Sequence, residues 1–321
     1  MKAAVVRELG QPPSYGDFED PSTRPGETLV STTAAAVSHL ARSRASGEHY
    51  SAGAAPPFVP GVDGVGRTDD GKRVFFAFPR PPFGSLAALV PVAAGCLAEL
   101  PNDLDDVTAA AAANPGMSCW VPLTRLAPVR SGESVLVNGA TGVAGRMAVQ
   151  VAKYLGASKV VATGRDETKL RELSGLGADV LLSLHQPMES FRDAVRTVAR
   201  EERVGVVLDY LWGPSAEAIL RGLEGPNAPR GASRVRYVQV GSVAGPTITL
   251  ASASLRSSGV EILGTGLGSS TLEALVAGIG DFLRVFSKAR FRVAVDAHPL
   301  SDVGRAWDMA APEKRLVFTV P

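Results

Sequence analysis

The stretch VLVNGATGVAG at residues 135–145 decides the fold that we predict for this chain of 321 residues. A short apolar run leads into a glycine-rich turn, and a helical pattern starts directly after it. Ala140, Gly142 and Gly145 have the spacing of a dinucleotide-binding fingerprint, with Ala140 in place of the first glycine. Gly142 would let a pyrophosphate approach the backbone, and Gly145 would let the helix pack closely on the strand. The N-terminus of that helix would offer N–H groups and a partial positive charge to the phosphates.

The next strand candidate ends in Gly164 and Arg165. An NAD site usually places a carboxylate near this point, where it binds the adenosine ribose. Arg165 follows here instead, and a guanidinium can bind a 2′-phosphate through two hydrogen bonds, with Lys169 as a second cation one helical turn later. We interpret Asp166 and Glu167 as acidic residues that open the next helix. The pattern therefore favours NADP(H) over NAD(H).

Apolar runs and helical patterns alternate from residue 134 onward, which is typical of βαβ units around a parallel sheet. Before residue 115 the chain has mainly short β-runs interrupted by proline and glycine. We therefore predict an α/β chain with a β-rich first part and a doubly wound second part. The expected strands are residues 2–7, 28–37, 73–77, 87–92, 135–137, 160–163, 180–182, 204–208, 237–240 and 262–263. The expected helices are residues 40–47, 146–155, 169–176 and 191–199, with a further helix from about residue 107.

The composition excludes several classes of protein. Hydrophobic residues make up 45% and charged residues 20% of the chain, so it is not mainly disordered. Lys and Arg (33) balance Asp and Glu (32), and we expect no nucleic-acid or membrane-surface partner. The longest apolar stretch, residues 86–97, contains Pro91 and is too short to span a bilayer. Because Arg7 and Glu8 precede any signal-peptide core, we expect a cytoplasmic protein.

Five segments together resemble the medium-chain dehydrogenase/reductase superfamily, and within it the zinc-independent quinone oxidoreductase (zeta-crystallin-like) branch. They are MKAAVV at 1–6, PFVPGVDG at 57–64, GMSCW at 116–120, VNGATGVAG at 137–145 and EKRLVF at 313–318. The resemblance implies a GroES-like β-rich catalytic domain at residues 1–117 and 267–321, and a Rossmann NADP-binding domain at residues 118–266. It also implies a homodimer that pairs through the apolar strand at residues 259–264.

Zinc-dependent relatives hold a catalytic metal with Cys, His and Cys. At the corresponding positions this chain has Ser38, Val62 and Pro115, none of which is a good zinc ligand. Cys96 and Cys119 are the only cysteines in the sequence, so a four-cysteine structural zinc site and a disulfide framework are also excluded. We expect no metal in the active site.

The resemblance also implies cofactor contacts beyond the glycine-rich turn. Ser118 occupies the position of a family threonine near the nicotinamide phosphate, and the glycines after the last two strands lie at the carboxyl edge of the sheet, where open α/β folds bind ligands. The predicted cofactor-binding residues are Ser118, Asn138, Ala140, Thr141, Gly142, Val143, Ala144, Gly164, Arg165, Lys169, Gly241, Ser242, Gly264, Thr265 and Gly266.

The expected reaction is the conjugate reduction of a small molecule. NADPH would deliver hydride to a quinone or to the β-carbon of an α,β-unsaturated carbonyl, while hydrogen-bond donors stabilise the developing oxyanion and a nearby group supplies a proton. The predicted catalytic residues are Tyr50, Ser38 and His49, and the residues predicted to line the substrate cleft are His39, Phe58, Trp120 and Trp212.

Two alternatives stay open at the level of sequence. The segment SHLA at 38–41 departs from the family pattern Asn-x-x-Asp, which allows a non-catalytic NADPH-binding regulatory protein. An NADPH-dependent enoyl-thioester reductase would need a basic surface for the carrier phosphates, for which Arg42 and Arg44 are candidates. We interpret these two arginines as part of a solvated face.

Overall fold

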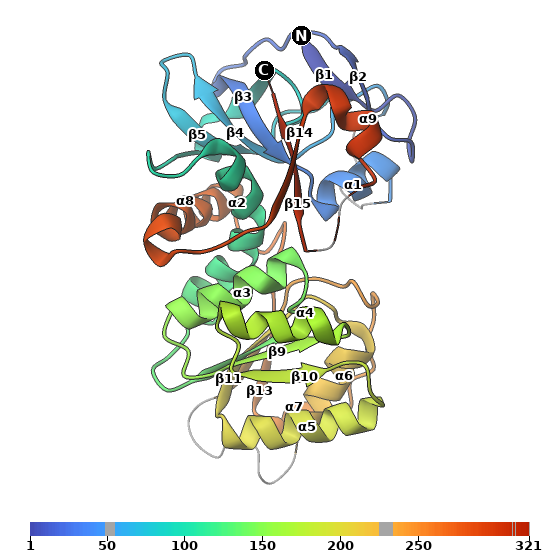
Figure 1. Ribbon diagram of the computed structural model, residues 1–321, viewed down its shortest axis with the longest axis vertical. Coiled ribbons are helices and arrows are strands. Elements are labelled where there is room, and N and C mark those ends of the chain that lie inside the picture. Colours follow the sequence, from blue (N-terminus) through green and yellow to red (C-terminus); the bar gives the residue numbers. More distant parts are fainter. Residues whose placement is uncertain (49–54, 225–233, 310, 312, 321) are drawn as a thin grey trace. The chain divides into compact units, whose positions relative to one another are not determined.

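The computed structural model describes residues 1–48, 55–224, 234–309, 311 and 313–320. The chain divides into two compact units, of which the first comprises Met1–Met117 and Thr271–Pro321 and the second comprises Ser118–Ser270 (Figure 1). The first boundary falls inside one helix, α2 (Asp106–Val121), which contains Pro115. A single π-helical turn follows it at Pro122–Leu126.

The core of the first unit is a mixed, mainly antiparallel sheet. Its strands are β3 (Glu27–Ala36), β4 (Asp63–Thr68), β5 (Arg73–Ala77), β6 (Leu89–Ala93), β7 (Leu97–Glu99), β14 (Val295–Pro299) and β15 (Arg315–Thr319). They follow the order β14-β15-β3-β4-β5-β7, with β6 also paired to β3, and only β14 and β15 run parallel. Strand β3 is central because it pairs with three neighbours, and its end, Ala34 to Ala36, is fully buried. A separate antiparallel pair is formed by β1 (Lys2–Val5) and β2 (Ser14–Asp17).

The helices of the first unit begin and end at recognisable capping residues. Helix α1 (His39–Ser46) begins where the Ser38 hydroxyl oxygen accepts the Ala41 N–H at 3.1 Å, and it ends at Gly47 with φ of 80°. Helix α8 (Leu272–Ala289) is capped in the same way by Thr271. The other helical segments of this unit are α9 (Val303–Ala306) and the 3₁₀ turns Ala94–Cys96 and Leu300–Asp302.

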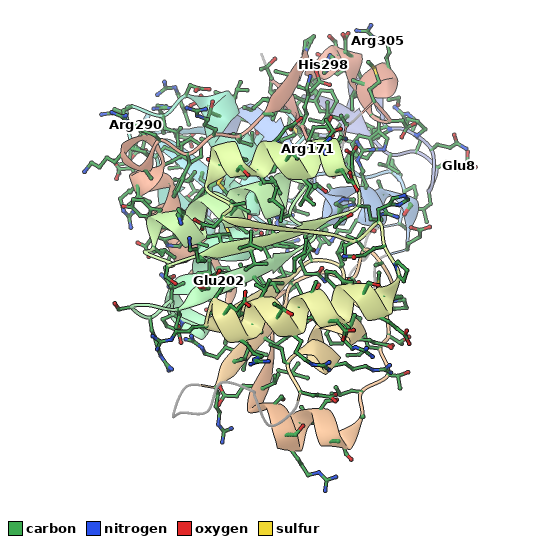
Figure 2. The ribbon with its side chains drawn as sticks, turned by 60° about the horizontal axis from the view of Figure 1, so that its bottom comes forward. Glu8, Arg171, Glu202, Arg290, His298 and Arg305 are labelled. Atoms are coloured by element: carbon green, nitrogen blue, oxygen red, sulfur yellow. The ribbon has the colours of Figure 1, made fainter. Side chains whose placement is uncertain are left out.

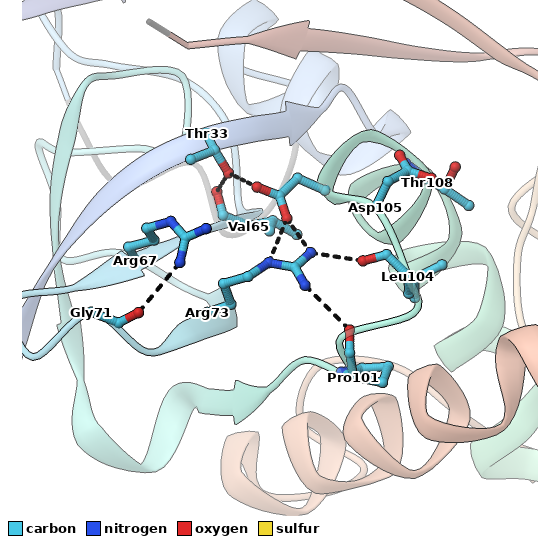
Figure 3. A network of polar contacts seen from close by, with 10 residues as sticks. Thr33, Val65, Arg67, Gly71, Arg73, Pro101, Leu104, Asp105 and Thr108 are labelled. Carbon is cyan, nitrogen blue, oxygen red and sulfur yellow. Dashed lines mark hydrogen bonds and ion pairs between the residues drawn. The ribbon is translucent and has the colours of Figure 1, made fainter.

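A polar network fixes the start of α2 against the sheet (Figure 3). The Arg73 guanidinium on β5 pairs with the Asp106 carboxylate and donates to the carbonyl oxygens of Leu104 at 2.7 Å and Pro101 at 3.3 Å. The Thr33 hydroxyl on β3 donates to the same carboxylate at 2.6 Å. Because Asp106 is in the first turn of α2, its charge also suits the helix dipole.

The second unit is built on a six-stranded parallel sheet. Its strands are β8 (Ser134–Asn138), β9 (Val160–Gly164), β10 (Val180–Ser183), β11 (Val204–Asp209), β12 (Val235–Gln239) and β13 (Val260–Gly264). Their order is β10-β9-β8-β11-β12-β13, and every neighbouring pair is parallel. The chain reverses its direction of winding between β8 and β11, and such a switch point is where open α/β sheets bind their ligands.

Helices cover both faces of this sheet, as the strongly apolar strands require. They are α3 (Val143–Tyr154), α4 (Glu167–Glu172), α5 (Met188–Glu201), α6 (Gly213–Gly222) and α7 (Ser252–Ser258), with a 3₁₀ turn at Leu173–Leu176. Helices α3 and α4 lie on one face, and α5 and α6 lie on the other (Figure 1). Figure 2 marks the two faces through Arg171 on α4 and Glu202 at the end of α5. Leu136 on β8, Phe191 on α5 and Ile219 on α6 belong to one buried core between the sheet and these two helices.

Every expected strand and helix overlaps an observed element, but several boundaries were wrong. Helix α3 begins at Val143 rather than at residue 146, and β12 ends at Gln239, so Val240 is not part of it. Strand β4 was missed because its sequence, DGVGRT, has two glycines. A Cβ atom on Gly66 would lie 2.3 Å from the Ser31 carbonyl oxygen, so glycine serves a close strand contact there. Strands β2, β7, β14 and β15 and helices α6 to α9 were also not anticipated.

None of the helices in the described part of the chain has the length and apolar character to cross a membrane.

Candidate active site

The glycine-rich turn joins β8 to α3 at the carboxyl edge of the parallel sheet. A Cβ atom on Gly145 would lie 2.4 Å from the carbonyl oxygen of Gly139 and 2.5 Å from the Cα atom of Ala140. Both neighbours are backbone atoms that cannot move aside, so α3 can approach the turn this closely only with glycine at position 145. Gly139 itself has φ of 86°, in the left-handed region. The packing role predicted for Gly145 is confirmed.

The N-terminus of α3 has the features of an anion-binding site. Gly142 is its N-cap and supplies no side-chain hydrogen bond, and the first turn contains no acidic residue. The N–H groups of that turn are therefore not occupied by a capping side chain. Arg146 links the turn to α4, because its Nε donates to the Thr141 carbonyl oxygen at 3.0 Å and its Nη2 donates to Glu172 on α4 at 2.6 Å.

A buried polar network lies beneath the turn. The Asn138 amide donates to Asp209 Oδ1 at 2.7 Å, and the Thr163 hydroxyl donates to Asn138 Oδ1 at 2.8 Å. The Gly139 N–H donates to Thr163 Oγ1 at 3.0 Å, and the Tyr237 hydroxyl donates to Asp209 Oδ2 at 2.6 Å. All four side chains are completely buried. The network joins the ends of β8, β9 and β11 to the middle of β12. Through Thr163 it links the Asn138 side chain to the Gly139 N–H of the turn.

Sequence reasoning found Asn138 but missed Asp209 and Tyr237 in this network. The available signal was a polar residue at the end of an otherwise apolar strand, which Asp209 shares with Asn138. Burial and then the neighbouring Asp209 raise the pKa of Tyr237, so its hydroxyl stays protonated and donates.

The two predicted phosphate-binding cations follow β9, Arg165 directly after the strand and Lys169 on α4. Arg165 is exposed and Lys169 is half-buried. Asp166 is the N-cap of α4, and its carboxylate accepts the N–H groups of Thr168 at 3.0 Å and Lys169 at 3.1 Å. The prediction that Asp166 opens this helix is confirmed. A Cβ atom on Gly164 would lie 2.4 Å from Thr141 Cγ2, so the ends of β8 and β9 are in close contact.

The remaining predicted cofactor residues lie along the same edge. Gly241 follows β12 by two residues, and its N–H donates to the Asp209 carbonyl oxygen at 3.1 Å. Gly264 is the last residue of β13, and the Thr265 N–H donates to the Gln239 carbonyl oxygen at 3.0 Å. In unit 2 the structure thus brings the following predicted residues to one edge of the sheet: Asn138, Ala140, Thr141, Gly142, Val143, Ala144, Gly164, Arg165, Gly241, Ser242, Gly264, Thr265 and Gly266.

The side-chain hydroxyls of Ser118 and Tyr210 form a pair, of which the sequence predicted only Ser118. Ser118 Oγ lies 3.1 Å from the Tyr210 hydroxyl, and Tyr210 directly follows β11 at the carboxyl edge. Burial raises the pKa of Tyr210 well above its ordinary value, so the phenol stays protonated and can donate a hydrogen bond. The sequence indicated Ser118 but offered no pattern that pairs it with Tyr210.

The predicted catalytic and cleft residues of the first unit are only partly described. Ser38 is buried and caps α1, while its neighbour His39 is exposed. Phe58 is buried, and its backbone exchanges hydrogen bonds with Val6 at 2.9 and 3.2 Å. His49 and Tyr50 lie outside the described residues. The roles of all five residues stay predictions.

The two tryptophans predicted to line the cleft belong to the second unit. The Trp120 ring lies 6.2 Å from that of Tyr154, and Trp120 is 9% exposed. The Trp212 ring lies 6.3 Å from that of Tyr237, and its residue has the positive φ of 58° at the start of α6. The Trp212 N–H donates to Asp209 Oδ1 at 3.1 Å, so the buried network also holds this strained residue.

No metal centre emerges from the described residues. Within them, no group of three or more His, Cys, Asp or Glu side chains has an arrangement that would hold a metal ion. Cys96 and Cys119 are buried and form no disulfide bond within the described residues, and burial raises the pKa of both thiols. The thiol form of a cysteine is a poor metal ligand and a poor nucleophile.

Known proteins with similar sequences and structures include NADPH-dependent reductases. Residues 144–279 match the family described as zinc-binding dehydrogenase. The chain is 29% identical to the Emericella nidulans protein named "Probable NADPH-dependent quinone reductase tdiC", over 100% of both chains. It is 29% identical to the 2-haloacrylate reductase of a Burkholderia species, over 66% of each chain. A mycobacterial protein solved in complex with NADPH has the same fold, with a TM-score of 0.81 at 25% identity over 99% of this chain and 100% of that one.

A parallel dinucleotide-binding sheet, a GroES-like β-rich unit and a full-length match to a reductase define a medium-chain dehydrogenase/reductase, and the chain belongs to that superfamily. Within the superfamily it belongs to the zinc-independent quinone oxidoreductase branch. The family description mentions zinc, but Ser38, Val62 and Pro115 offer no suitable donor at the expected ligand positions. The predicted fold class and family are confirmed.

Proposed function

We propose that this protein is a zinc-independent oxidoreductase that transfers hydride from NADPH to a quinone or to an α,β-unsaturated carbonyl compound. The observation that carries the proposal is the uncapped N-terminus of α3 behind a turn that only glycine permits, followed by Arg165 at the end of β9. The names of the full-length fungal relative and of the Burkholderia reductase describe the same kind of reaction.

The residues of the second unit fit NADP(H). The first-turn N–H groups of α3 would bind the pyrophosphate, and Arg165 with Lys169 would bind the 2′-phosphate. The nicotinamide, when bound, supplies the hydride. The chain's own residues then have to orient the ring and stabilise charge. The Ser118 and Tyr210 hydroxyls, 3.1 Å apart, form a donor pair at the same sheet edge. Tyr50, His49 and Ser38 stay the proposed sources of the proton.

Substitution of Arg165 tests the cofactor assignment. Hydrogen bonds to charged groups contribute about 1.5–3 kcal/mol, so Arg165→Ala should raise the KM for NADPH roughly tenfold or more and leave that for NADH unchanged. Arg171→Ala is the matched control, because Arg171 is also exposed on α4 and, among the described residues, pairs with Glu167 and Thr168 of the same helix. Equal use of NADPH and NADH by the unsubstituted protein would contradict the assignment. NADPH binding without oxidation by any quinone or enone would support the regulatory alternative.

We further propose a cytoplasmic homodimer that acts on a small molecule. The support for the dimer is that β13 is the outer strand of the parallel sheet and that Ile262 on it is 37% exposed. An apolar outer strand with unpaired backbone groups favours addition of a strand from a second copy.

A further inference from the structure

Three charged side chains gather where β3 leads into α1 in the first unit. Asp63 begins β4 and Arg315 begins β15, and both strands pair with β3. Arg42 is on α1, directly after β3. The Val37 N–H donates to the Leu316 carbonyl oxygen at 2.9 Å, which ties the start of β15 to the start of α1. The three charges act on one another electrostatically, Arg315 with both Asp63 and Arg42.

Asp63 and Arg315 are buried and Arg42 is half-buried, and each has a polar atom without a hydrogen-bond partner among the described residues. Arg315 is only 9% exposed, and its Nε and Nη2 atoms have no hydrogen-bond partner among the described residues. The same is true of Arg42 Nη2 and Asp63 Oδ1. A buried guanidinium that lacks an acceptor is costly, and proteins keep one where water, an ion or a ligand completes it. Arg42, which the sequence assigned to a solvated face, is only partly exposed, because its guanidinium lies over the Trp307 ring, 5.4 Å from the ring centroid.

The charge of the cluster matches a single negative charge. Arg42 and Arg315 together carry two positive charges, and burial raises the pKa of Asp63 to about 6, so this carboxyl offers at most one negative charge. Loss of solvation and then the charges of Arg315 and Arg42 lower the pKa of His39, so the imidazole adds no positive charge at neutral pH. Asp308 approaches Arg42 only at 3.8 Å and is 75% exposed, so it screens the cluster weakly.

We propose that Arg42 and Arg315 bind a carboxylate of the substrate, which makes α,β-unsaturated acids the preferred substrate class over neutral quinones. The inference rests on the proposed function and deepens it. A planar guanidinium pairs with a planar carboxylate through two parallel hydrogen bonds, and the three orphaned N–H-bearing atoms supply such donors. His39, one of the residues predicted to line the substrate cleft, interacts electrostatically with both arginines. The Arg42 side chain is still 28% exposed, so an anion can reach it from solvent.

The test compares an acid with its neutral ester. The probes are 3-benzoylacrylate and its methyl ester, each reduced with NADPH. We expect kcat/KM for the acid to exceed that for the ester at least tenfold. Arg315→Met and Arg42→Met should each lower kcat/KM for the acid at least tenfold and leave that for the ester within twofold. Arg305→Met is the control, because Arg305 is exposed and its ion pair within the described part of the chain is with Asp302. An acid-to-ester ratio unchanged in both variants overturns the proposal.

Two further measurements are needed. The first distinguishes a substrate carboxylate from a coenzyme phosphate as the bound anion, and the second distinguishes failure of the anion site from failure of the proposed reaction. If the variants weaken NADPH binding, followed by its fluorescence, and the acid-to-ester ratio stays constant, the arginines bind a coenzyme phosphate and the proposal is wrong. If the protein reduces neither probe, calorimetric titration with the saturated acid 3-benzoylpropionate still decides, since heat that Arg42→Met abolishes supports the site without turnover. Absence of heat with the unsubstituted protein overturns the site. Arg42→Met also decides if Arg315→Met does not fold, because it leaves the Asp63–Arg315 interaction in place.

Discussion

Gly145 shows how much a single atom matters in this fold. A Cβ atom there would meet backbone atoms of Gly139 and Ala140 at 2.4 and 2.5 Å, and forcing it in would displace the turn from α3. Such overpacking costs about 1–3 kcal/mol, so Gly145→Ala should weaken NADPH binding roughly tenfold or more by fluorescence titration. Gly175→Ala is the matched control, since nothing lies within 4 Å of a Cβ atom at that position. Unchanged affinity in Gly145→Ala would refute the role of the close contact.

Asp63 should make the stability of the first unit depend on pH. Burial raises the pKa of its carboxyl from 3.8 to about 6, so the folded state holds a proton that the unfolded state has already released between these values. Stability should therefore fall as pH rises from about 4 to about 6 and level off above, by roughly 3 kcal/mol at 1.36 kcal/mol per unit.

Asp63→Asn isolates this effect, because an amide does not titrate. The difference in unfolding free energy between the unsubstituted protein and Asp63→Asn, measured by denaturant titration from pH 4 to pH 7, should shift by the stated amount in favour of the variant as pH rises. Asp69→Asn, at an exposed position, should show no such shift. A pH-independent difference for Asp63→Asn would contradict the assignment.

At the scale of elements, the second unit depends on hydrogen bonds that join four neighbouring strands of the sheet. Asp209 accepts from the Asn138 amide, from the Tyr237 hydroxyl and from the N–H groups of Leu211 and Trp212 at 2.6–3.1 Å. A completely buried carboxylate is tolerated only when its lone pairs are occupied in this way. The network thus makes the end of β11 a rigid support for the turn after β8.

Tyr237→Phe removes one donor from this carboxylate without changing the volume of the core. Loss of a hydrogen bond that leaves a buried charged group short of a partner costs about 1–3 kcal/mol, so the thermal midpoint of the second unit should fall. Tyr15→Phe is the control, because Tyr15 is 37% exposed. The two variants would be compared by differential scanning calorimetry, and equal midpoints would show that Asp209 does not need the tyrosine.

At the scale of the whole molecule, the outer strand β13 leads to a prediction about assembly. Ile262→Lys places a charge on the edge strand, which opposes the addition of another strand. The unsubstituted protein should have twice the mass of one chain by light scattering at micromolar concentration, and Ile262→Lys should have the mass of one chain. Val243→Lys, at a position that is 72% exposed outside the sheet, should stay dimeric. A monomeric unsubstituted protein would refute the dimer.

Much of the fold and the cofactor site was predictable because their signals are local. The turn at residues 139–142, the alternation of apolar strands with helices, and the Asp166 cap all depend on residues close together in the chain. Strands such as β14 and β15 were missed because they are stabilised by partners far away in the sequence.

The sequence by itself determined the class of fold, the position of the glycine-rich turn and the cations that follow β9, since each depends on residue type and spacing over a few positions. Only the tertiary structure decided that Tyr210 meets Ser118, that Asp209 and Tyr237 support the turn, and that the charges of Arg42 and Arg315 act on each other. The physical reason is that burial and charge pairing are properties of a packed environment. Arginines at positions 42 and 315 become neighbours only after β15 has paired with β3.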